Sequence, residues 1–277
     1  MAAISAAGNP ALAARVCAAY VTTSSVGPPG GILLENRSEP IFNVPAIVTA
    51  TIALIVAVHA LREFVLTDSA DRELLLLFAF IPVRYDSSLA SVVWPGGVGG
   101  DIWTFVTYAF IHGDWVHLGI NAVWLLAFGT PVARRFGATR FMAFFALTAA
   151  AGAGAHLLTH PGERVWMVGA SAAISGFMAA AIRFAFQRGG PLSLIGSRDE
   201  SLYRQPAVPL LSVLKDTRTL AFLIVWFGLN LLFGLGSLSI DGGEQAIAWQ
   251  AHIGGFLAGL IGFAAFDPVR SAVANPT

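Results

Sequence analysis

The stretch AIAWQAHIGGFLAGLIGFAAF, Ala246–Phe266, contains no Asp, Glu, Lys or Arg. About 20 mainly apolar residues are enough for an α-helix to cross the hydrocarbon core of a bilayer. A helix is expected because an open segment in lipid has no other way to satisfy its backbone hydrogen bonds. His252 lies inside this stretch, and an ionisable side chain at membrane depth is a candidate functional residue.

The composition agrees with a membrane protein. Of the 277 residues, 56% are hydrophobic and only 12% are charged, with a mean hydropathy of +0.71, whereas soluble domains carry about 25% charged residues. The 16 basic and 16 acidic residues cancel, so no nucleic-acid partner is expected. The single cysteine, Cys17, excludes an internal disulfide and argues against a structural zinc cage.

Further apolar runs predict an all-α, polytopic membrane protein with a bundle of six transmembrane helices. Besides Ala246–Phe266, the runs are roughly Val44–Leu61, His117–Val132, Phe141–Leu158, Val168–Phe186 and Leu220–Leu238. We expect a flexible cytoplasmic tail over residues 1–43, a membrane domain over 44–267 and a short tail over 268–277. Most of the Lys and Arg residues then fall on the cytoplasmic side if both termini are inside, as the positive-inside rule favours.

A long first external loop, Arg62–Val116, separates the first two predicted helices. It contains the apolar run Leu74–Pro82, which is too short to span. An interfacial or re-entrant element is favoured for this run, and a small external subdomain is the alternative.

Four polar residues are predicted to lie at one depth: Ser171, His252, His117 and Asn121. At 1.5 Å of rise per residue, each lies roughly 18–25 Å from the cytoplasmic end of its helix. In a hydrocarbon core about 30 Å thick, all four are in the outer half. They comprise a nucleophile, a base and two hydrogen-bond donors, which is what serine-type hydrolysis requires.

The surroundings of these residues allow both a structural and a catalytic interpretation. The segment GASAAISG, Gly169–Gly176, has the small residues that pack membrane helices closely, and Gly255 and Gly259 form a GxxxG face. However, the run after Ser171 is too short to cross the bilayer, so a helix should begin near the serine. Free backbone N–H groups at that helix start could stabilise an oxyanion. His117 and Asn121 share one helix face. They could either donate hydrogen bonds to the oxyanion or form hydrogen bonds that hold neighbouring helices together.

With these motifs the chain resembles the rhomboid family of intramembrane serine proteases. The matching pieces are His117-x-x-x-Asn121, Gly169-x-Ser171 and Ala251-His252-x-x-Gly255. The resemblance implies Ser171 as nucleophile and His252 as general base, without a carboxylate to orient the imidazole. It implies an oxyanion hole formed by His117, Asn121 and the Ser171 backbone N–H.

The resemblance also implies that the substrates are transmembrane helices of other proteins, cut within the lipid bilayer near its outer boundary. No cofactor and no metal are expected, and a bacterial inner membrane is the expected location. Three positions depart from the pattern of the family: Ala172 replaces a frequent Gly, Ser175 a frequent aromatic residue, and Thr104 the Arg that often follows Trp103.

Three other functions remain open. A rhomboid-like relative could bind membrane proteins without cleaving them, and a transporter could use the polar cluster as a substrate or proton site. A metalloprotease is disfavoured because the chain has no HExxH motif.

Overall fold

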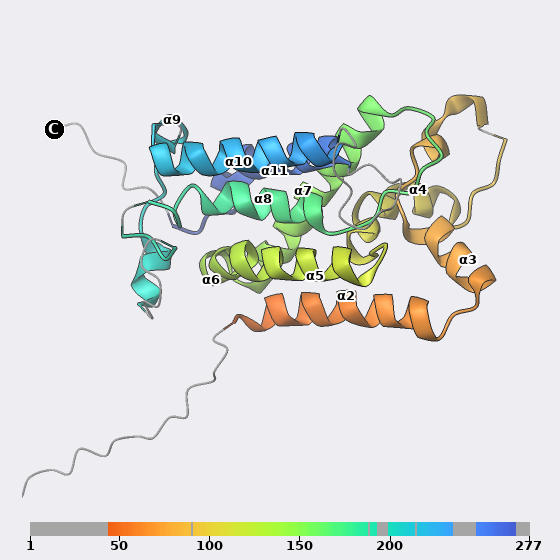
Figure 1. Ribbon diagram of the computed structural model, residues 1–277, viewed down its shortest axis with the longest axis horizontal. Helices are drawn as coiled ribbons and strands as arrows, with labels where there is room; N and C mark the ends of the chain where they lie inside the picture. The colour runs from red at the N-terminus through yellow and green to blue at the C-terminus, as the bar shows by residue number, and fades with distance from the viewer. Residues whose placement is uncertain are drawn as a thin grey trace, which may run out of the picture. The chain divides into compact units, whose positions relative to one another are not determined.

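The computed structural model describes residues 44–89, 91–187, 189–192, 199–213, 215–234 and 248–269. The described part is helical and contains no β-strand, only an isolated bridge between Phe80 and Met167. Its α-helices are shown in Figure 1. They are α2 (Ala46–Phe64), α3 (Asp68–Phe78), α4 (Gly97–Thr107), α5 (Trp115–Trp124), α6 (Thr130–Phe136), α7 (Ala138–Thr159), α8 (Ser171–Ala181), α9 (Leu210–Val213), α10 (Thr217–Gly234) and α11 (Trp249–Phe266).

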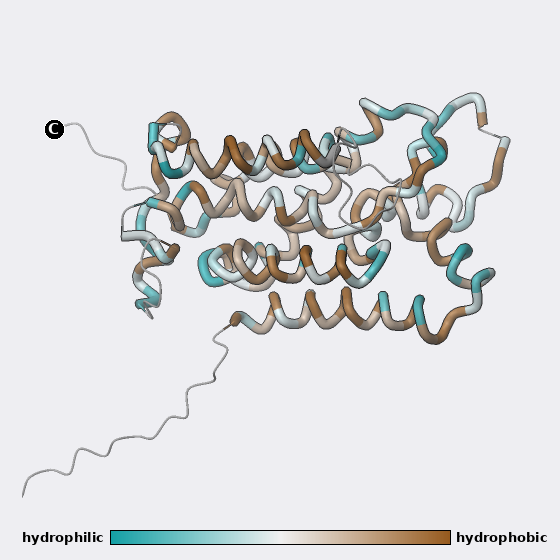
Figure 2. Tube along the Cα trace, viewed as in Figure 1, coloured by the Kyte–Doolittle hydropathy of each residue, from teal (hydrophilic) through white to brown (hydrophobic). Residues whose placement is uncertain are grey.

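Four helical stretches are long and apolar enough to cross a membrane. They are α2, the continuous stretch Trp115–Phe136, α7 and α11, while Ser171–Ala181 and Thr217–Leu232 are apolar but shorter. Figure 2 shows apolar residues along the helices and hydrophilic ones gathered near their ends. The chain is therefore a multi-pass membrane protein, and its described part is helical. The count of six spans and the orientation of the termini stay predictions. So do the domain boundaries, because residues 1–43 and 270–277 lie outside the described part.

The second long stretch is continuous but not regular. A π-helical turn, Leu125–Gly129, joins α5 to α6, and Pro131 follows at the start of α6. Proline has no backbone N–H to donate to the preceding turn, so the regular hydrogen-bond ladder is interrupted there.

The centre of the bundle is formed by α7, α8 and α11, which pack against one another. Glycines on α11 permit the closest approach. A Cβ at Gly255 would overlap the carbonyl of Ala172, and one at Gly259 would lie 2.6 Å from the Cα of Gly176. Backbone-to-backbone packing of this kind is how small residues associate membrane helices. It brings the start of α11 against the start of α8.

Buried arginines hold the connections at both ends of the bundle. Arg135 of α6 forms two 2.8 Å hydrogen bonds to Asp267, just after α11. In the first loop, the Arg84 side chain is fully buried and pairs with Asp101 at 2.7 Å. A buried guanidinium needs several acceptors, and Arg84 also donates to the carbonyls of Leu76 and Pro95.

The apolar run Leu74–Pro82 does not form one helix. Its first half completes α3, and Pro82 begins a 3₁₀ turn, Pro82–Tyr85. No residue of α3 is fully buried, which fits an element at an interface as well as one on an external subdomain. The choice between the two stays a prediction.

Candidate active site

Ser171 and His252 are in direct contact. Ser171 is the first residue of α8, and His252 lies in the first turn of α11. The serine Oγ is 2.7 Å from the histidine Nε2, although the residues are 81 positions apart in the chain. That distance is a normal hydrogen bond, in which the hydroxyl can donate to an unprotonated ring nitrogen.

Asn230 of α10 contacts the other nitrogen of the same imidazole. Its Oδ1 is hydrogen-bonded to His252 Nδ1, and its Nδ2 donates to the carbonyl of Trp226 at 2.8 Å. The second bond assigns the orientation of the amide, because a carbonyl can only accept. Oδ1 therefore faces a protonated Nδ1, which leaves the lone pair of Nε2 directed at Ser171.

Asn230 was not among the residues predicted from the sequence, because only a carboxylate was considered as a partner for His252. The available signal was a single Asn in the apolar run Leu220–Leu238, and a strongly polar residue at membrane depth is a functional candidate. The arrangement in the structure is a row of three side chains from three helices: Ser171, His252 and Asn230.

The segment before Ser171 is held by hydrogen bonds to the first loop. The N–H of Gly169 donates to the carbonyl of Tyr108 at 3.1 Å, and the N–H of Ala170 points to Nε2 of His112 at 3.5 Å. Gly169 has φ +114°, a conformation that other residues rarely adopt. A Cβ there would lie 2.7 Å from the ring of His117. Only glycine fits both the backbone and the space.

His112 is a structural residue of this loop. It is fully buried, and burial lowers its pKa to about 3, with smaller contributions from the charges of His117, His59 and Arg62. The ring is therefore neutral at pH 7 and can accept from Ala170. Arg62 also donates to the carbonyl of His112 at 2.6 Å.

His117 and Asn121 lie on α5, next to this segment. Asp114 caps the helix by accepting from the N–H of His117 at 2.8 Å, and the ring of His117 packs against Gly169. Asn121 is 4% exposed, and its Nδ2 donates to the carbonyl of His117 at 2.9 Å. This bond runs along its own helix and uses one of the two amide hydrogens, so the second remains for another acceptor. The roles of both residues as oxyanion donors stay predictions.

The three residues that depart from the family pattern each make defined contacts in the structure. Ser175 is buried and donates to the carbonyl of Ser171 at 2.7 Å. Ala172 is 1% exposed, in the contact between α8 and α11. Thr104 donates to Gly100 at 2.8 Å and lies 2.7 Å from the hydroxyl of Tyr85.

Comparison with known proteins agrees with this arrangement. The sequence model of the Rhomboid domain matches residues 99–266, which is more than half of the chain. The chain belongs to the rhomboid family. The matched residues run from within α4 to the end of α11 and include Ser171, His252 and Asn230.

A similar protein is RHOMBOID-like protein 5 of Arabidopsis thaliana. It is 29% identical over 179 residues, which are 64% of this chain and 48% of that protein. This rhomboid chain thus spans about half the length of the curated relative it matches. The relative is a plant protein, so the comparison gives no support to the expected bacterial inner membrane.

Proposed function

We propose that this rhomboid-family protein is an intramembrane serine endopeptidase that cuts transmembrane helices of other proteins. The observation that carries the proposal is the 2.7 Å contact between Ser171 Oγ and His252 Nε2. A serine becomes a useful nucleophile when an adjacent base can take its proton, and this contact provides that base. Catalysis by both residues is the function that the geometry supports best.

In the proposed reaction, His252 Nε2 accepts the proton of Ser171 as Oγ attacks the scissile carbonyl carbon. The C–N bond then breaks, and His252 returns the proton to the leaving amine nitrogen. A water molecule next attacks the acyl ester on Ser171 and gives a proton to His252. The bond between the acyl carbon and Ser171 Oγ then breaks, His252 returns the proton to Oγ, and the new carboxyl end is released. Throughout, Asn230 Oδ1 accepts from Nδ1 and stabilises the imidazolium that forms.

The tetrahedral intermediate carries a negative oxygen that needs donors. The backbone N–H of Ser171 lies at the start of α8, where N–H groups have no partner within the helix and the helix dipole is positive. We assign His117 and Asn121 as the further donors. Donors of this kind are each worth about 3 kcal/mol in the transition state.

The proposed class of substrate follows from the helical setting. A peptide bond within a helix is shielded, so cleavage needs local unwinding, and Gly, Ser and Pro lower helix propensity. We propose six spans with both termini in the cytoplasm, the site in the outer half of the bilayer, and substrates carrying such residues near the outer boundary. Membrane proteins are thus the proposed partners, with no cofactor.

Cleavage by the purified protein tests the proposal. The full chain in liposomes is given a model transmembrane substrate with a Gly- and Ser-containing outer segment, and Ser171→Ala is the control. Cleavage of the substrate by the wild type but not by Ser171→Ala supports the proposed endopeptidase activity. Binding of the substrate without cleavage by the wild type would instead identify an inactive, binding relative, and transport unaffected by Ser171→Ala would identify a transporter.

A further inference from the structure

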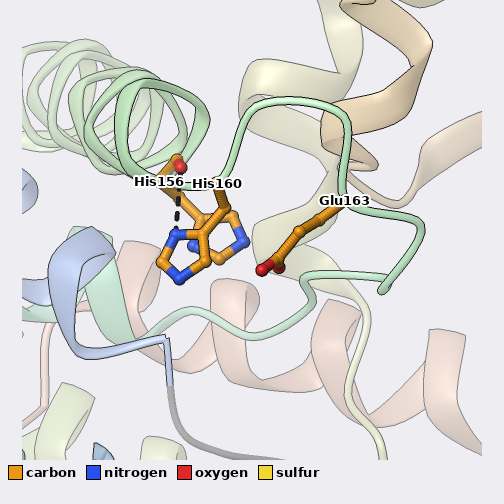
Figure 3. A group of neighbouring side chains, drawn as sticks. All are labelled: His156, His160 and Glu163. Atoms are coloured by element: carbon orange, nitrogen blue, oxygen red, sulfur yellow. Dashed lines mark hydrogen bonds between the residues drawn. The ribbon is translucent and has the colours of Figure 1, made fainter.

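A second cluster of titratable side chains lies at the C-terminal end of α7. It consists of His156, His160 and Glu163, of which the two histidines are one helical turn apart. One ring nitrogen of each histidine and one carboxylate oxygen all lie within 4.8 Å of one another. Figure 3 shows the Glu163 carboxylate pointing toward the two imidazoles, whose ring centroids are 4.4 Å apart.

The His160 ring is held in the form that binds metals. Its Nδ1 lies 3.3 Å from the carbonyl of His156 and 2.8 Å from the hydroxyl of Thr159. Because a carbonyl can only accept, Nδ1 carries the proton and Nε2 presents its lone pair. Metal-binding histidines usually have their other N–H held by a carbonyl or a carboxylate in this way.

His156 has an unsatisfied nitrogen. The residue is 6% exposed, and its Nδ1 is buried with no hydrogen-bond partner in the described part of the chain. An unpaired buried polar atom is costly and calls for an explanation. A metal ion held by this imidazole supplies one, since coordination replaces hydrogen bonding in fixing the ring.

We propose that His156, His160 and Glu163 form a zinc-binding site outside the catalytic row of Ser171, His252 and Asn230. Two imidazoles and one carboxylate are a donor set that Zn²⁺ accepts, with the fourth position left to water. Mg²⁺ and Ca²⁺ prefer oxygen ligands only and are disfavoured. Ligand atoms around tetrahedral zinc are about 3.4 Å apart, so zinc binding would draw the three ligand atoms closer together, to which the exposed Glu163 side chain can contribute by rotation.

The site adjoins the helix that carries His252. Nε2 of His160 lies 3.4 Å from Nε2 of Gln250, in the first turn of α11. A zinc ion bound to His160 Nε2 would use the lone pair toward which the Gln250 amide now points, so the contact between His160 and Gln250 would be lost. Zinc occupancy thus changes a contact two residues before His252, while the proposed proteolysis itself uses no metal.

The site departs from the expectation of no zinc cage, which rested on the single cysteine. That argument concerns thiolate ligands, whereas this cluster uses only imidazole and carboxylate groups.

Zinc binding by the full chain in detergent tests the proposal without use of proteolytic activity. The protein is stripped with a chelator, desalted and titrated with Zn²⁺ against a chromophoric chelator, and bound metal is counted by mass spectrometry. We expect one zinc per chain and a thermal unfolding temperature that rises with zinc. Co²⁺ in place of zinc should give the visible absorption of a tetrahedral site.

Variants assign the ligands. His160→Ala and Glu163→Gln should each weaken zinc binding by at least about tenfold. Glu73→Gln, an exposed carboxylate on α3, and His252→Ala should bind zinc as the wild type does. The proposal would be overturned if the wild type bound no stoichiometric zinc, or if both ligand variants bound zinc with the affinity of the wild type. Loss of zinc binding in His252→Ala would also overturn it.

Discussion

The substitution Asn230→Ala removes the hydrogen bond by which α10 holds the His252 ring. A neutral hydrogen bond contributes about 0.5–1.5 kcal/mol, and one to a charged group about 1.5–3 kcal/mol. The imidazole is neutral before reaction and charged once it has taken the proton of Ser171. The bond therefore becomes stronger by about 1–1.5 kcal/mol between the ground state and the transition state, and its loss should lower kcat by about 5–13-fold.

KM should change little, because Asn230 acts through His252 and an interaction made mainly in the transition state appears in kcat. Initial rates on a fluorogenic transmembrane substrate in liposomes, over a range of substrate densities, separate the two constants. Leu229→Ala, an exposed neighbour on α10, is the matched control and should keep the wild-type kcat. Asn230→Asp keeps an oxygen that accepts from Nδ1 and should retain more activity than Asn230→Ala.

Two results would refute this reasoning. A kcat for Asn230→Ala equal to that of Leu229→Ala would show that the amide does not orient the base. A rise in KM with unchanged kcat would place Asn230 at the substrate rather than behind His252.

Three further predictions concern the oxyanion donors, the helix packing and metals. Asn121→Ala should lower kcat by about 10–1000-fold with little change in KM in the same assay; an intact kcat with a lower unfolding temperature would make the residue a packing contact. Gly255→Ala places a methyl group against the carbonyl of Ala172 and should destabilise the protein by about 1–3 kcal/mol. Thermal unfolding should show this, whereas Gly228→Ala, which has open space around its Cβ, serves as the control, and equal unfolding temperatures would contradict the close contact. Cleavage should persist in EDTA and phenanthroline, and a loss that zinc restores in His160→Ala as well as in the wild type would indicate metal-dependent hydrolysis.

Much of the helix arrangement could be predicted because its physical causes are local. Apolar length and the absence of charge identify spans such as Ala246–Phe266, and α11 ends at the predicted residue. The shortness of the run after Ser171 predicted a helix that begins near the serine, and α8 begins there. The constant rise of a helix then placed Ser171 and His252 at one level, and the structure brings them into contact.

The remaining contacts depend on information that one sequence does not carry. The run Leu220–Leu238 has Asn230 as its one strongly polar residue, and a single side chain does not show that its face turns toward His252 of α11, so Asn230 was not assigned. The same holds for the loops. Arg84 and His112 join segments that are far apart in the chain, and only the folded loop shows which backbone groups they satisfy.

Covalent labelling tests the central claim most directly. The purified wild-type chain is treated with a small fluorophosphonate, digested, and the adduct mapped by mass spectrometry. The account predicts one adduct, on Ser171, that is absent in Ser171→Ala and forms far more slowly in His252→Ala. A wild-type protein that remains unlabelled, an adduct on Ser175 instead, or undiminished labelling in His252→Ala would contradict the account.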